Sequence, residues 1–303
     1  MIASNKKVDP KDLKLRRYLI ARHGETTYNK ERRVQGTSDA SMLTLNGISQ
    51  ASSLGVYIAR RQAGELLESD GSSTTSQTTI QKSHTAEESY TPSIKRTWCS
   101  PLTRCRQTYA AISGCCSTYS AKNSVLPEPT IHDDLREIEL CTWQNRLRSD
   151  IIKNDTTNWN IFKDAPKLLQ LPKEGKEFYP VVDCWERSIQ NWNTIRSDAA
   201  DAATTTTNTN EQGEGAIFIM CHGAIGQCML LQALGIGIDH YGKSRRYSFD
   251  NCECIEIEWK DDVVDDENES GYAVRWRRVH PVTTEWELTS LSRKMGGELM
   301  CSR

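Results

Sequence analysis

Apolar and polar positions along the chain follow two different periods. Short apolar runs such as "YLIA" and "AIFIM" have the length of buried strands, whereas other segments repeat apolar residues every three or four positions, which is typical of helices. We therefore predict strands at residues 17–21, 94–99, 216–221, 252–259 and 273–279, helices at 46–66, 101–112 and 224–234, and a helical middle section at about 146–196. This order predicts an α/β fold, a three-layer α/β/α sandwich with a mostly parallel central sheet.

Two polar stretches interrupt this pattern. Residues 65–92 and 197–215 are rich in Ser, Thr, Asn and Gln and contain few residues that can build a core. Each stretch lies just before a predicted strand, so we expect surface insertions into one domain, residues 1–303, rather than a boundary between two domains.

Composition excludes several classes of protein. Of the 303 residues, 37% are hydrophobic and 26% are charged, and the net charge of -2 gives no overall attraction to nucleic acid or to a membrane surface. No run reaches the roughly 18 apolar residues of a membrane span, and the N-terminal stretch has neither an apolar signal core nor a long leader rich in Ser and Arg. We therefore expect a cytoplasmic globular protein, whose oligomeric state the sequence leaves open.

The cysteine pattern indicates neither disulfides nor a metal site. The eleven cysteines are an odd number without paired CxxC spacing. The one close pair, Cys252 and Cys254, alternates along a predicted strand, so we expect both side chains in the core. No metal ligands and no cofactor site are predicted.

Three predicted strands lead into residues that suit an anion. The first leads into "RHGE", with Arg22 and His23, the second leads into a helix that carries Arg104 about one turn in, and the third leads into His222 and Gly223. Because ligands of parallel sheets collect at the carboxyl ends of the strands, we expect these side chains to lie together.

These residue types suit phosphoryl transfer. Guanidinium groups present forked donors to phosphate oxygens, helix N-termini add backbone N–H donors, and a neutral imidazole can attack phosphorus. The set therefore predicts transfer of a phosphoryl group through a phosphohistidine.

Motifs in the same order resemble the histidine phosphatase superfamily, also called the phosphoglycerate mutase-like family. They are "RHGETTYN", "QGTSDASMLTLNGISQA", "CSPLTRCRQT", "LREIELCTWQ" and "CHGAIGQ". The resemblance implies a helical insertion over the active site, His23 as the phosphorylated nucleophile and Glu137 as the proton donor. It also implies a phosphate pocket formed by Arg22, Asn29, Arg104 and His222.

Two features of the "LREIELCTWQN" segment affect how far the family's pattern applies to this chain. Glu137 belongs to an acidic cluster with Asp133, Asp134 and Glu139, and such clusters are usually solvated surface. Cys141 and Asn145 stand where many family members have glycine. We expect this difference to alter the mouth of the site rather than its catalytic groups.

The middle and C-terminal parts resemble the branch of photosynthetic organisms that includes 2-carboxyarabinitol-1-phosphatase, which makes a plastid the alternative location. An apolar stripe at helical spacing runs through this part and is expected in the core: Val182, Trp185, Ile189, Trp192 and Ile195. Arg146, Arg148 and Arg187 are candidates to contact a substrate carboxylate or second phosphate, although a solvated charged face is the commoner role.

Three functions fit these observations. The favoured one is a phosphatase for small phosphate monoesters of the sugar, sugar-acid or glycerate type, with His23, Glu137, His222 and Arg22 in catalysis and Arg22, Asn29, Arg104, His222 and Gly223 binding the substrate. The alternatives are a cofactor-dependent phosphoglycerate mutase and a non-catalytic protein that binds a phosphate ligand. A small phosphate ester is the only expected partner.

Overall fold

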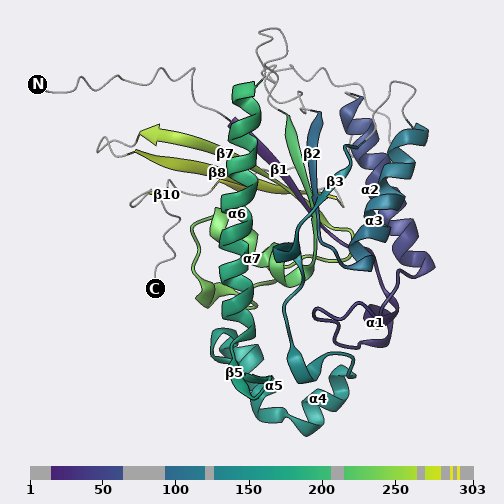
Figure 1. Ribbon diagram of the computed structural model, residues 1–303, viewed down its shortest axis with the longest axis vertical. Helices are drawn as coiled ribbons and strands as arrows, with labels where there is room; N and C mark the ends of the chain where they lie inside the picture. Colours follow the sequence, from purple (N-terminus) through teal and green to yellow (C-terminus); the bar gives the residue numbers. More distant parts are fainter. Residues whose placement is uncertain are drawn as a thin grey trace, which may run out of the picture.

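A central sheet with helices on both faces forms the body of the protein (Figure 1). The computed structural model describes residues 15–63, 93–119, 126–205, 215–264, 270–280, 287–288 and 292–293. The predicted insertion at 65–92 lies outside the described residues.

The sheet has eight strands in the described part of the chain, with the path β10-β8-β7-β1-β6-β2-β3 and β9 paired to β8. The strands β3, β2, β6 and β1 are parallel neighbours, and β7 and β8 continue the sheet as antiparallel strands. Their bounds are β1 Leu15–Arg22, β2 Ile94–Cys99, β3 Pro129–Ile131, β6 Ala216–Cys221, β7 Cys254–Val264, β8 Ser270–His280, β9 Glu287–Leu288 and β10 Ser292–Arg293.

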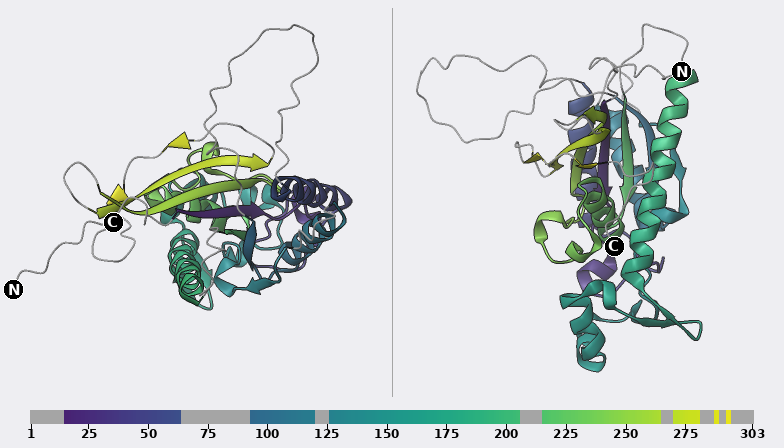
Figure 2. Two further views of the ribbon diagram at one scale, coloured as in Figure 1. Left: turned by 90° about the horizontal axis from the view of Figure 1, so that it is seen from above. Right: turned by 90° about the vertical axis from the view of Figure 1, so that its left-hand side faces the viewer.

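Helices cover the two faces in pairs (Figure 2). One face carries α2 and α3, and the opposite face carries α6 and α7, while α1, α4 and α5 lie beyond one end of the sheet (Figure 1). Their bounds are α1 Thr27–Glu31, α2 Leu45–Gln62, α3 Thr103–Tyr119, α4 Arg148–Asn154, α5 Thr156–Asp164, α6 Pro180–Thr205 and α7 Gly223–Ala233. The predicted α/β/α class with a mostly parallel central sheet is confirmed.

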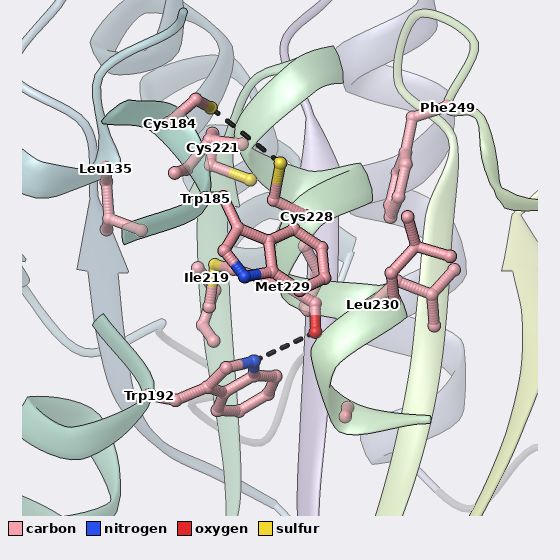
Figure 3. Packing of buried hydrophobic residues seen from close by; sticks show 14 of the residues in the cluster. Leu135, Cys184, Trp185, Trp192, Ile219, Cys221, Cys228, Met229, Leu230 and Phe249 are labelled. Carbon is pink, nitrogen blue, oxygen red and sulfur yellow. Dashed lines mark hydrogen bonds between the residues drawn. The ribbon is translucent and has the colours of Figure 1, made fainter. Parts of the chain in front are cut away.

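Alternation along the strands produces two separate apolar clusters. Tyr18 and Ile20 of β1 pack toward α6 and α7, whereas Leu19 and Ala21 pack toward α2 and α3. Figure 3 shows the first cluster, in which Trp192 donates its indole N–H to the carbonyl oxygen of Met229 at 2.9 Å. Trp185, Trp192 and Ile195 of the predicted stripe are therefore core, as expected, and Ile189 packs against them. Val182 is only half-buried, and its neighbour Val181 is buried in the cluster instead.

The middle section differs from the prediction in one respect. It contains α4, α5 and the start of α6, but a short antiparallel hairpin of β4 (Leu171–Lys173) and β5 (Lys176–Phe178) stands between them. The residues at its turn, Glu174 and Gly175, both have positive φ, which fits a tight two-residue turn. The helical prediction for residues 171–178 was wrong because a hairpin with strands this short leaves almost no periodic signal.

Two further bounds differ from the predictions. The helix α6 continues to Thr205, into the expected insertion at 197–215, because the stretch "SDAADAA" is rich in alanine, the strongest helix former; residues 206–214 lie outside the described residues. Cys252 precedes β7 with a left-handed φ of 56° instead of alternating along it with Cys254. Both thiols are nevertheless buried in the same apolar cluster.

The described residues contain neither a membrane-spanning helix nor a cluster of metal ligands. No helix in these ranges combines the length and the apolar character needed to cross a membrane. No group of three or more His, Cys, Asp or Glu side chains within them is placed to hold a metal ion.

Candidate functional site

The two histidines lie side by side because of the sheet register. β1 and β6 are parallel with Arg22 opposite Cys221, so the next residues, His23 and His222, leave the sheet together. Their ring centres are 5.1 Å apart, and both side chains are buried. The prediction that separate strands bring these residues to one edge is therefore confirmed.

The backbone around His23 fixes its ring. Its Nδ1 lies 2.8 Å from the carbonyl oxygen of Gly24, so the proton belongs on Nδ1 and the lone pair on Nε2. The N–H of Gly24 donates to Thr108 Oγ1 at 3.0 Å. A Cβ at Gly24 would lie 2.5 Å from the carbonyl oxygen of Gly47, which explains why glycine follows the histidine.

Arg22 reaches from the same strand end toward the start of α7. Its Nη1 donates to the carbonyl oxygen of Phe249 at 2.7 Å, while its buried Nε has no hydrogen-bond partner. A Cβ at Gly223, the first residue of α7, would lie 3.5 Å from that Nε, so the absence of a side chain leaves the guanidinium beside the helix N-terminus. An unpaired donor next to a helix N-terminus is suited to an anionic oxygen.

Arg104 connects the second histidine to a nearby loop. Its Nε donates to His222 Nδ1 at 3.2 Å, and its Nη1 and Nη2 donate to the carbonyl oxygens of Ser38 and Gly36, each at 2.8 Å. His222 Nε2 lies 2.7 Å from Ser100 Oγ, which fits a proton on that nitrogen. Arg104 is completely buried, so its charge is shielded from solvent.

Glu137 also belongs to the site. Its Oε1 accepts the N–H of Ala224 at 3.0 Å and that of Ile225 at 3.4 Å, at the start of α7, and the N–H of Ile138 at 3.0 Å. The alternative of a solvated acidic surface therefore does not hold for this residue, because its carboxylate faces the protein. Its role as proton donor remains a prediction.

Asn29 is connected to His23 through the side chain of Asn251. Its Oδ1 accepts the N–H of Thr26 at 3.1 Å, as part of the capping box that starts α1. Asn251 donates from Nδ2 to Asn29 Oδ1 at 3.2 Å and to the carbonyl oxygen of His23 at 3.1 Å. The structure thus brings Asn29 close to the backbone of His23, and its phosphate contact remains a prediction.

Burial and charge set the protonation of the histidines. Burial lowers the pKa of His23 well below 6.5, and the charges of Arg104 and Arg22 lower it further. The pKa of His222 is lowered well below 6.5 by the same causes, with His23 adding to them. Burial also lowers the pKa of both arginines, so an anion between them would offset the cost of burying two cations.

This environment gives a first testable prediction. In an NMR titration of the imidazole nitrogens, we expect His23 to be neutral at pH 6.0 with its proton on Nδ1, because burial and two arginines oppose a second proton. A histidine with an ordinary pKa would be about three-quarters protonated at that pH. The His23→Ala variant assigns the signal, and a ring that titrates near pH 6.5 would contradict this account.

Three arginines expected near the substrate have different positions. Arg187 donates to the backbone carbonyl oxygens of Arg136 and Glu137, so it contacts the protein instead of presenting a free guanidinium. Arg148 is exposed and lies over the ring of Trp159, 4.8 Å from its centre. Arg146 accepts the N–H of Val34 at its carbonyl oxygen. The substrate role of Arg146 and Arg148 remains a prediction.

The two departures from the family pattern have a conformational consequence. Cys141 and Asn145 have φ angles of 44° and 66°, in the left-handed region that favours glycine. Asn145 tolerates this region well, and Cys141 tolerates it less well. The side chain of Asn145 contacts Ser38 through Oδ1, 2.6 Å from the serine hydroxyl, so this departure adds a contact near the loop that Arg104 holds.

Sequence reasoning missed several residues that position the site. Thr108 was detectable in principle, because it lies one helical turn after Arg104 and therefore on the same face of α3. Asn251 and Phe249 lie more than 200 residues from His23 along the chain, and no local pattern marks them. Asp39 accepts the N–H of Thr103 at 2.7 Å at the start of α3, and these two residues are 64 positions apart in the sequence.

Solved structures of other proteins share this fold. The native structure of a mycobacterial glucosyl-3-phosphoglycerate phosphatase superposes with a TM-score of 0.57 at 17% identity, covering 88% of this chain and 98% of that one. Bacillus stearothermophilus YhfR superposes with a TM-score of 0.52 at 21% identity, covering 82% of this chain and 92% of that one. At these identities, the likeness establishes the fold alone.

Sequence comparison supports the branch expected from the motifs. The chain is 25% identical over 226 residues to an Arabidopsis thaliana protein named probable 2-carboxy-D-arabinitol-1-phosphatase, covering 75% of this chain and 35% of that one. It is 23% identical over 226 residues to the Triticum aestivum 2-carboxy-D-arabinitol-1-phosphatase, covering 34% of that protein. The match thus spans about a third of the length of these curated relatives.

A family model gives the broader assignment. The model of the histidine phosphatase superfamily, branch 1, matches residues 18–79 and 75–265, which include every residue of the site described above. The chain that places His23 and His222 side by side belongs to the histidine phosphatase superfamily, branch 1.

Proposed function

We propose that the protein is a phosphatase that hydrolyses small phosphate monoesters through a phosphohistidine on His23. One observation carries the proposal: the Nδ1 proton of His23 is held by Gly24, and burial lowers the pKa of the ring, so Nε2 is available as a nucleophile beside the buried Arg104 and the half-buried Arg22. A neutral imidazole next to cations is suited to attack a phosphoryl group whose negative charge those cations bind.

The proposed reaction has two displacements at phosphorus. In the first, the Nε2 lone pair of His23 forms the N–P bond while the bond to the ester oxygen breaks and its electron pair leaves with the alcohol. Glu137 supplies the proton that this oxygen takes up. In the second, water attacks phosphorus and gives a proton to the carboxylate of Glu137, which restores the acid. The N–P bond breaks, and its electron pair returns to Nε2 as phosphate leaves.

The neighbouring groups have separate roles in this proposal. Arg22 and Arg104 hold the non-bridging oxygens, where negative charge is spread in the transition state, and the N–H of Gly223 adds a donor at the start of α7. His222 joins them by exchanging the hydrogen bond between its Nε2 and Ser100 for one to a phosphate oxygen. Asn29 is proposed to assist from the start of α1. The two guanidinium groups already balance the charge of a phosphate dianion, so we expect phosphate release to be unaffected by EDTA; loss of activity that Mg²⁺ restores would contradict this part.

The substrate class follows from the relatives and remains a proposal. Proteins similar to this chain are named for phosphates of a sugar acid and of a glucosylated glycerate. We therefore propose a sugar, sugar-acid or glycerate phosphate as the substrate of this chain.

Release of phosphate separates the proposed function from its alternatives. Purified protein incubated with 3-phosphoglycerate, glycerol 3-phosphate and p-nitrophenyl phosphate is expected to release inorganic phosphate from each without a bisphosphoglycerate primer. A mutase would require the primer and form 2-phosphoglycerate. A binding protein would bind the esters without release and without forming phosphohistidine.

Glu137→Gln is expected to slow the enzyme in a way that depends on the leaving group. An alkoxide leaving from glycerol 3-phosphate is strongly basic and needs a proton, whereas p-nitrophenolate leaves unaided. The variant should therefore lose on the order of 10²-fold in the rate of phosphohistidine formation with the alkyl ester, and far less with the nitrophenyl ester. Single-turnover mixing measures this step even where hydrolysis of phosphohistidine limits turnover.

The exposed neighbour Asp133 provides the matched control, because Asp133→Asn changes an acidic residue of the same segment on the solvent side. Equal losses on both esters for Glu137→Gln would mean that Glu137 is structural. The next acids to test would then be Glu139 and Asp134.

A further inference from the structure

Arg187 connects α6 to the segment that carries Glu137. Its Nη1 donates to the carbonyl oxygens of Asp134 and Arg136 at 3.0 and 2.8 Å, and its Nη2 donates to that of Glu137 at 3.1 Å. One guanidinium therefore binds three carbonyl groups within four residues of chain. The side chain is only 16% exposed, and its bonds to Asp134 and Glu137 are partly buried, whereas the one to Arg136 is exposed.

A second set of contacts holds the guanidinium in place. Its Nε donates to Asp183 Oδ2 at 2.9 Å, one turn earlier on α6. One turn after Arg187, the buried Asn191 donates from Nδ2 to the carbonyl oxygen of Asp134 at 2.9 Å. Side chains from three successive turns of α6 therefore hold residues 134–137, either directly or by fixing the guanidinium of Arg187.

The segment itself has little regular structure to hold it. Only the short 3-10 helix η2 (Asp133–Leu135) precedes Glu137, with two backbone bonds, Leu135 N–H to His132 and Arg136 N–H to Asp133. The carbonyl groups that Arg187 binds are therefore those that the turn does not use. Loss of the guanidinium would leave up to three carbonyl groups without this partner and release the backbone on which Glu137 is carried.

The two ends of Glu137 are held by two helices that pack together. Arg187 of α6 binds its carbonyl oxygen, while the N-terminus of α7 binds its carboxylate. The helices are joined by the bond from Trp192 to Met229 that Figure 3 shows and by one from Gln232 to the carbonyl oxygen of Trp185 at 2.8 Å. The packing of α6 against α7 therefore fixes where the backbone and the carboxylate of Glu137 lie relative to each other.

We propose that Arg187 is a positioning residue that holds Glu137 at the distance and orientation needed to protonate the leaving alcohol. This inference rests on the proposed function, and it replaces the expected substrate contact of Arg187. Misplacement of a reacting group by about 1 Å costs up to 10²-fold in rate. Arg187→Met, which keeps the apolar stem and removes the donors, is therefore expected to act through Glu137.

Three esters separate this role from its alternatives. In single-turnover phosphohistidine formation, Arg187→Met should lose roughly 10- to 100-fold on both 3-phosphoglycerate and glycerol 3-phosphate, but under about 2-fold on p-nitrophenyl phosphate. The loss should appear in the rate at saturation with little change in KM. A substrate contact would instead raise KM for 3-phosphoglycerate, the ester with a carboxylate, and leave glycerol 3-phosphate unaffected.

A double variant tests whether Arg187 acts through Glu137. In a Glu137→Gln background, Arg187→Met should add less than about 2-fold, because the group that it positions is already absent. Arg187→Lys should recover part of the rate, since a lysine lacks the planar fork but keeps a charged donor. The exposed neighbour on the same helix gives the control Glu186→Gln, which should match the parent protein.

The outcomes distinguish the inference from the function on which it rests. If the parent protein releases no phosphate from any ester, the proposed function fails and the inference fails with it. If the parent is active and Glu137→Gln is selective for alkyl esters, but Arg187→Met slows all three esters alike or none, the inference alone is overturned. Asn191→Ala, which removes a single carbonyl contact, should show the same selectivity at smaller size if Arg187→Met does not fold.

Discussion

Replacing His23 with alanine is expected to abolish phosphate release from every ester, because no other group in the site has a lone pair in the position of Nε2. His222, the other ring at 5.1 Å, has its Nδ1 occupied by Arg104 and its Nε2 occupied by Ser100. Residual activity should be below about 10⁻³ of the parent, in line with the loss of other covalent nucleophiles. Phosphate release measured by a coupled assay checks this result.

Folding of the variant needs a separate control. His23 is 1% exposed, more buried than a strand-end residue is expected to be, and its removal leaves the carbonyl oxygen of Gly24 without its partner. That change costs about 1–3 kcal/mol, which a stable domain tolerates. The exposed His240 gives the control His240→Ala, and near-normal phosphate release by a folded His23→Ala protein would contradict the mechanism.

Arg104→Ala is expected to reduce the rate of phosphohistidine formation by about 10²- to 10³-fold. Loss of one donor to the transition-state oxygens accounts for roughly 2.7–4 kcal/mol in comparable sites. The variant also removes the hydrogen bond to His222 and those to the carbonyl oxygens of Gly36 and Ser38, so the loss includes disorder of neighbouring groups. Rapid-mixing measurements at saturating ester separate this loss from weaker binding.

Two variants separate charge from geometry at this position. Arg104→Lys keeps the positive charge but cannot bind His222 and two carbonyl groups at once, so it should recover only part of the rate. Arg106, exposed on the same helix, gives the control Arg106→Ala, which should behave as the parent protein does. Parent-like rates for Arg104→Ala would remove Arg104 from the mechanism.

The sheet and its strand ends could be predicted from the sequence. Continuous apolar runs mark β1 and β6. Each of these strands ends directly before a histidine, so parallel pairing alone brings His23 and His222 together. Arg104 follows from the helix that begins after β2. These residues were accessible because each lies within a few positions of an element with a strong local signal.

The groups that position the site could not be predicted in the same way. Arg187 and Asn251 act on the backbone of residues about 50 and 228 positions away, and a charged or amide side chain has the same local pattern whether it is solvated or bound to a distant carbonyl group. Glu137 was marked by its motif, whereas its neighbours suggested a solvated cluster. The short hairpin of β4 and β5 was missed because three-residue strands carry almost no periodicity.

The stereochemical course at phosphorus tests the central claim most directly, because it does not require phosphohistidine to accumulate. A chiral ester that carries three oxygen isotopes is used to transfer its phosphoryl group to an added alcohol, and the configuration of the product is determined. Two in-line displacements, by His23 and then by the alcohol, predict retention of configuration. Inversion would show direct attack by the acceptor and would contradict a phosphohistidine intermediate.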